Sequence, residues 1–134
     1  AGNWEKIYEE LEKLREKIRN REREETYGLD RKKQMPFFRI FRAELFNSEQ
    51  LTEEQISQNV SITMEVYNLI RTEIQLTGFW DSPPAQSRLK GNLQSLFLSQ
   101  EYLRLPNMRI KFRVLITRVM EHAKANHFII IGET

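Results

Sequence analysis

The apolar positions of this 134-residue chain recur with the period of an α-helix along almost its whole length. We predict a first, highly charged amphipathic helix over residues 1–27. It carries an apolar stripe whose members are spaced by three and four residues, namely Trp4, Ile7, Leu11, Leu14 and Ile18. We expect this stripe to pack on the domain's own core. Self-association through the stripe is the alternative.

A second helical unit is predicted over residues 29–47, with Asp30 as a cap and Pro36 marking a break or restart. A capping box at Thr52 and Gln55 predicts the start of a third helix that runs to about Ile74. This third helix is apolar on two sides, which is typical of a helix in the middle of a domain.

Residues 78–84 form the clearest loop, in which Asp81 or Ser82 caps the next helix and Pro83 is its first residue. A fifth helix is expected over residues 108–125, capped by Asn107 and ended by Asn126. Residues 128–131 are β-prone, and with no partner strand in view we expect residues 128–134 to form an extended tail. The prediction is a single all-α domain, residues 1–134, of about five helices around a central long helix, with a helical core at 28–127 and no significant sheet.

Composition narrows the class of protein only slightly. The chain has no cysteine, no apolar run long enough to cross a membrane and a net charge of +2, and we expect a cytoplasmic protein without membrane contact. Residues 1–80 have a net charge of −2 and residues 81–134 a net charge of +4. This asymmetry indicates a partner surface in the second half, such as one for nucleic acid, unless the halves merely offset each other. The chain opens at Ala1 without a methionine, and we expect it to be a piece of a longer protein.

Catalytic signatures are not found in the sequence. It contains no glycine-rich phosphate loop, and His122 and His127 are five residues apart, about 140° around a helix, so they would not share a metal. We therefore expect no catalytic residue, metal or cofactor in this segment.

The basic residues are more informative. One cluster, around Phe37, Phe38 and Phe41, is opposed locally only by Asp30, and another lies on the predicted helix 108–125. Bases in such clusters can neutralise DNA phosphates. The candidate nucleic-acid-binding residues are Arg31, Lys32, Lys33, Arg39, Arg42, Arg88, Lys90, Arg109, Lys111, Arg113, Arg118 and Lys124.

Three apolar side chains are candidates for partner binding. Ile110 and Val114 lie opposite the core stripe of their helix, where either another helix of the domain or a partner chain would cover them. Trp80 has two interpretations. It plugs the gap between helices together with Phe79, or it is an exposed anchor for a partner subunit.

Two runs of the sequence resemble a known family. Residues 78–83, followed by Arg88, Lys90 and Leu93, are similar to a run near the C-terminus of the motor (R) subunits of type I restriction–modification systems. Residues 105–127 look like the closing helix of the same family, and the order and spacing of the motifs agree along nearly the whole chain. Gly78 departs from the family pattern, in which we expect an acidic residue at this position.

The resemblance implies a function for the parent protein and a narrower one for this segment. The family couples ATP-driven DNA translocation to cleavage, with nuclease and motor domains upstream of this segment. ATP and Mg²⁺ would belong to those upstream domains. The implied partners of this segment are the modification (methyltransferase) subunit, double-stranded DNA contacted without sequence preference, and the upstream motor domains. The implied role is non-catalytic assembly and DNA contact, and the alternative is a structural or protein-docking cap with no DNA contact.

Overall fold

The protein, as a computed structural model, is 77% helical and contains seven α-helices and no strand in the part of the chain that is described, residues 2–47 and 50–132. Side chains are described at 3–15, 24–47 and 50–132. The predicted all-α fold is confirmed. None of the helices in this described part is long and apolar enough to cross a membrane.

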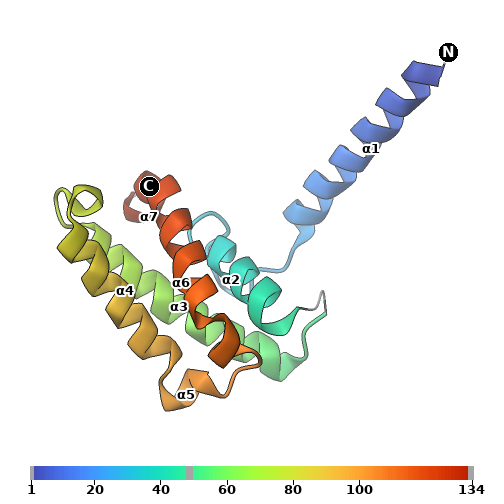
Figure 1. Ribbon diagram of the computed structural model, residues 1–134. Helices are drawn as coiled ribbons and strands as arrows, with labels where there is room; N and C mark the ends of the chain where they lie inside the picture. The colour runs from blue at the N-terminus through green and yellow to red at the C-terminus, as the bar shows by residue number, and fades with distance from the viewer. Residues whose placement is uncertain (1, 48–49, 133–134) are drawn as a thin grey trace.

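The centre of the domain is α3 (Glu53–Ile74), as the sequence predicts. It is packed by α2 (Met35–Phe41), α4 (Pro83–Phe97) and the C-terminal α7 (His127–Ile131), while α6 (Met108–Ala125) covers α2 and α4 (Figure 1). Fully buried apolar side chains from these helices form one continuous core, which includes Phe37, Phe41, Ile62, Ile70, Leu89, Phe97 and Leu115.

The predicted helix starts are confirmed at two places. Thr52 and Gln55 form the complete capping box at the start of α3, because the Thr52 hydroxyl accepts from the Gln55 N–H and the Gln55 side chain accepts from the Thr52 N–H. Ser82 caps α4 by accepting from the Ala85 N–H, with Pro83 as the first helical residue. Pro36 lies in the first turn of α2, which is the predicted restart.

The expected capping role of Asn107 is wrong in its detail. Asn107 does precede α6, but its side chain makes no cap. It has φ 62°, a left-handed conformation that asparagine tolerates, and its Nδ2 donates to the Leu45 carbonyl at 2.8 Å. Leu45 lies in a π-helical turn, η1 (Arg42–Phe46), that follows α2. Asn107 therefore satisfies a carbonyl of a distant turn instead of its own helix.

The C-terminal segment is not the predicted extended tail. Residues 127–131 form α7, while residues 133–134 lie outside the described part. Ile130 is fully buried, and its carbonyl accepts a hydrogen bond from the Tyr67 hydroxyl at 3.4 Å. Packing on α3 overrides the β-propensity of the isoleucines, because no strand is present in the described chain to pair with them. The expectation of about five helices missed this helix and the short α5 (Gln100–Leu103).

The first helix differs most from expectation. α1 (Gly2–Arg23) projects away from the other helices (Figure 1). Its described stripe is solvent-exposed, from 50% at Ile7 to 78% at Trp4. The expected packing of this stripe on the core is therefore wrong, and Ile18 lies outside the described side chains. The physical reason is that the phenylalanines of α2 already occupy the space against α3 and α6.

Candidate nucleic-acid interface

The first basic cluster is partly neutralised within the fold, at Arg39 and Arg42. Glu24 accepts from Arg39 Nη2 at 2.7 Å and lies 3.7 Å from Arg42 Nη1. The backbone carbonyl of Glu24 also accepts from Arg31 Nη2 at 2.9 Å. The expectation that only Asp30 opposes this cluster locally is thus wrong, because Glu24, just after α1, also pairs with bases of the cluster.

Glu44 forms ion pairs with two bases on one side of α6. Its carboxylate lies 2.8 Å from Arg118 Nη1 and 3.4 Å from Lys111 Nζ. The four side chains held by Glu24 and Glu44 remain partly exposed, so each ion pair contributes little to stability. The two glutamates nevertheless lower the positive charge that Arg39, Arg42, Lys111 and Arg118 present to an anion.

The bases next to Asp30 have mainly structural contacts. The Asp30 carboxylate accepts from the backbone N–H groups of Lys32 and Lys33, which closes the turn before α2. Lys33 Nζ donates to the Gly132 carbonyl at 2.7 Å and so ties this turn to the end of α7. Lys32 is exposed.

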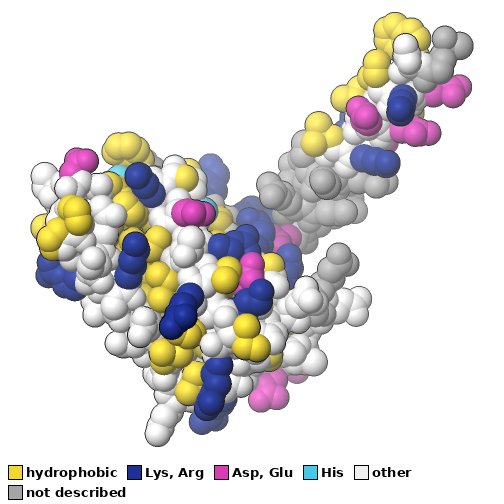
Figure 2. All heavy atoms as spheres, viewed as in Figure 1, with side chains coloured by type: hydrophobic (Ala, Val, Ile, Leu, Met, Phe, Trp, Pro, Cys, Tyr) yellow, Lys and Arg dark blue, Asp and Glu magenta, His cyan; other side chains and the backbone are white. Residues whose placement is uncertain are grey.

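Five predicted bases remain exposed on α4 and α6 and form no ion pair within the described residues. Figure 2 shows Lys and Arg side chains spread over the face that carries α6, with apolar side chains between them and fewer acidic ones. We call this surface the α4–α6 face. Its bases are Lys90, Arg109, Arg113 and Lys124, while Arg88 lies on the other flank of α4 from Lys90.

A shallow hollow of about 360 Å³ lies between the two helices of this face. Lys90 and Arg113 bring charge to it from opposite helices, and Ser87 and Gln94 bring polar groups. Gly91 also lines the hollow, and the space above its backbone is open. The side chains of Ser87, Lys90, Gln94 and Arg113 can all donate hydrogen bonds to an anion of phosphate size.

Ser87 and Gln94 are not among the site residues predicted from the sequence. Together with Lys90 and Gly91 they are spaced by three, one and three residues, which places all four on one side of α4. That spacing was the available signal. Its pairing with Arg113 of α6 depends on how the two helices pack.

Ile110 and Val114 are uncovered in the described structure, with Ile110 77% exposed. No other described helix of this domain covers the two side chains, so the first of the two alternatives is not observed. The guanidinium of Arg113 lies 5.3 Å from the Phe112 ring centroid, within the range of a cation–π contact.

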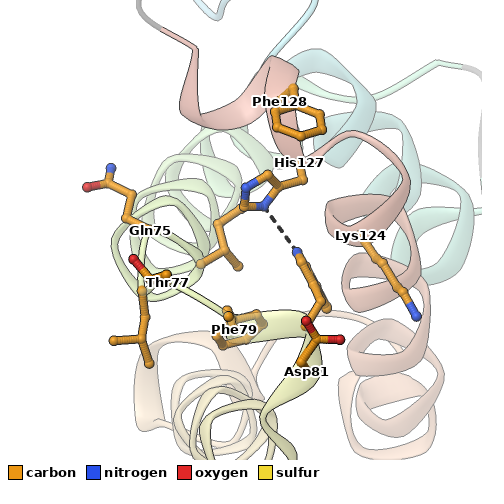
Figure 3. A pocket seen from close by; sticks show the side chains of 11 residues that line it. Gln75, Thr77, Phe79, Asp81, Lys124, His127 and Phe128 are labelled. Carbon is orange, nitrogen blue, oxygen red and sulfur yellow. Dashed lines mark hydrogen bonds between the residues drawn. The ribbon is translucent and has the colours of Figure 1, made fainter.

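Trp80 links the loop before α4 to the C-terminal helix. The loop contains a 3-10 turn, η2 (Phe79–Asp81), in which Phe79 is buried and Trp80 half-buried. Trp80 Nε1 donates to His127 Nδ1 at 3.0 Å, drawn as the dashed line in Figure 3. The indole can only donate, so His127 carries its proton on Nε2 in this arrangement. Trp80 thus has a structural role in this fold, and its role as a partner anchor stays a prediction.

The hydrogen bond of Trp80 leads to a stability prediction. Trp80→Phe keeps an aromatic ring against Phe79 but removes the only donor to His127 Nδ1 in the described chain. We expect a loss of about 1 kcal/mol in the free energy of unfolding, measured by urea denaturation. An unchanged urea midpoint would mean that the bond adds no net stability.

His122 leads to a prediction about pH. The ring packs edge-on against Phe37, with centroids 4.9 Å apart, and burial lowers the pKa of His122 from its ordinary value of 6.5. The unfolded chain therefore binds the proton more tightly than the folded chain. The stability from this group is fully present above pH 6.5 and is lost as the pH falls toward the folded pKa. The urea concentration at the unfolding midpoint should decrease as the pH is lowered from 7.5 to 5.5.

The control for this pH effect is His122→Gln, which has no titrating ring at the site. Its urea midpoint should change less with pH over the same interval. If the variant and the natural chain lose stability equally, His122 is not the group responsible.

Among the described residues no group of three or more His, Cys, Asp or Glu side chains is placed to hold a metal. Comparisons of the chain with protein-family models, with curated proteins and with solved structures find no match.

Proposed function

We propose that this domain is a non-catalytic module that contacts the DNA backbone through the α4–α6 face. In a type I restriction system, which its motifs resemble, it would also help to dock the motor subunit on the methyltransferase core. The observation that supports the DNA contact is that some basic residues are ion-paired within the fold and others are not. Glu24 and Glu44 hold four of them, while five on α4 and α6 have no ion pair in the described chain.

The chemistry of the hollow supports phosphate as the group contacted. Lys90 and Arg113 supply charge from two helices, and the Ser87 hydroxyl and Gln94 amide supply neutral donors. Lysine and arginine contacts to phosphates release counterions and so favour binding. Phosphate contacts carry no base information, so the proposed binding ignores sequence.

The docking part of the proposal is supported by the uncovered apolar pair Ile110 and Val114 on the same helix. Apolar side chains surrounded by bases are typical of a surface that meets another molecule. The modification subunit is the partner that the family resemblance implies. This pair is also the observation that favours the second candidate, a protein-docking cap with no DNA contact.

The test is a fluorescence-anisotropy titration of the domain with two duplexes of unrelated sequence at low and at physiological salt. We expect similar affinities for both duplexes and a fall with salt whose logarithmic slope is about −3 to −4 for four contacts. The absence of binding at low salt would reject the DNA contact and leave the docking cap. Strong preference for one duplex would also contradict the proposal, since backbone contacts do not discriminate.

A further inference from the structure

The exposed stripe of α1 has the spacing of a coiled-coil seam. Trp4, Ile7, Leu11 and Leu14 alternate steps of three and four residues, and the sequence continues the pattern to Ile18. A strict alternation of this kind corresponds to the a and d positions of a heptad repeat, which keep one narrow line of contact with a partner helix. The stripe is thus suited to another helix and not to a broad core surface.

α1 has no packing partner for this stripe among the described residues. It is 22 residues long, and its described apolar side chains are solvent-exposed. Most helical stability in proteins comes from the packing of an amphipathic face and not from intrinsic propensity. A partner helix would supply that packing.

We infer that α1 pairs with α1 of a second copy of this chain in an antiparallel two-stranded coiled coil. Charge complementarity identifies the occupant and its direction. Residues 2–13 contain four acidic and two basic side chains, while residues 14–23 contain five basic and two acidic ones. An antiparallel partner places each acidic half against a basic half, whereas a parallel partner places like against like.

The heptad register gives specific pairs. Antiparallel packing joins a positions to d positions, so Leu11 meets Leu14 of the second copy and Ile7 meets Ile18 of the second copy. The flanking g positions then place Glu10 opposite Lys17 of the second copy. Two-fold symmetry repeats each pair.

Arg21 distinguishes the two directions. It occupies the next d position after Ile18 in the sequence. A parallel pair would place Arg21 directly beside Arg21 of the second copy in the seam. The antiparallel register pairs position 21 with position 4 of the second copy, which avoids that like-charge pair.

Sedimentation velocity of the whole chain, from about 1 μM to about 1 mM, tests the pairing. We expect a concentration-dependent monomer–dimer equilibrium. Leu11→Glu should weaken dimerisation at least about tenfold, because it places a charge in the seam. Lys13→Gln is the matched control, since it changes the charge by the same unit at an outer position, and should leave the dimer nearly intact. A chain that stays monomeric throughout overturns the inference.

Charge exchange tests the direction. Glu10→Lys alone and Lys17→Glu alone each create two like-charge pairs in the antiparallel dimer and should weaken it about fivefold. The double variant, and an equimolar mixture of the two single variants, restore opposite charges and should recover the original affinity. In a parallel dimer Glu10 would face Arg15, so neither would recover it. Failure of both to recover therefore overturns the antiparallel arrangement.

Discussion

Replacing Lys90 and Arg113 together by glutamine should weaken binding of duplex DNA by about 30-fold at about 50 mM salt and make the logarithmic salt slope shallower by about 2. The two side chains line the hollow from α4 and α6. Each lost phosphate contact forfeits its share of counterion release, so affinity and salt dependence fall together. Anisotropy titration at several salt concentrations measures both quantities.

The matched control for this experiment is Lys6→Gln with Lys13→Gln. This variant removes the same charge from exposed positions of α1, which projects away from the α4–α6 face (Figure 1). We expect a much smaller loss of affinity. An equal loss in both variants would mean that binding follows net charge and not the α4–α6 face. Both altered residues of the test variant are exposed, so circular dichroism should show an unchanged fold.

Phe41→Ala should lower the free energy of unfolding by about 3–5 kcal/mol. Phe41 is fully buried and packs edge-on against Phe97, with ring centroids 5.9 Å apart. Truncation removes the buried ring and leaves a cavity between α2 and α4, whose lining relaxes only in part. Domains of this size are stable by about 5–15 kcal/mol, so this loss is a substantial share of the total stability. Urea denaturation followed by circular dichroism measures the change.

Phe128→Ala is the control for that experiment. The chemical change is identical, but Phe128 is 84% exposed on α7. We expect its effect on stability to stay within about 0.5 kcal/mol. A cost at Phe128 equal to that at Phe41 would show that the C-terminal helix is covered in solution by something beyond the described contacts.

Much of the fold could be predicted because it depends on local signals. The hydroxyl of Thr52, the amide of Gln55 and the hydroxyl of Ser82 act within one helical turn, so their capping roles can be read directly from neighbouring residues. The central position of α3 followed from apolar residues on two of its sides. Signals of this range need no knowledge of how distant segments meet.

Local signals failed where a distant segment decides the conformation. The isoleucines of α7 are β-prone by themselves, but Ile130 is buried against α3 and the segment is helical. The α1 stripe has the amphipathic pattern of a packed helix, but α2 takes the space beside the core. Propensity acts within a few residues, whereas burial depends on which segments lie next to the core in the folded chain.

The candidate site shows the same division. The sequence by itself determined which side chains are basic and that several share a face of a predicted helix. Only the tertiary structure decided which of them remain available to an anion, because Glu24 reaches Arg39 across 15 residues and Glu44 reaches Arg118 across 74. Salt screens exposed charges over about 8–10 Å, so the charge of a surface depends on which residues are neighbours in the folded chain and not on composition alone.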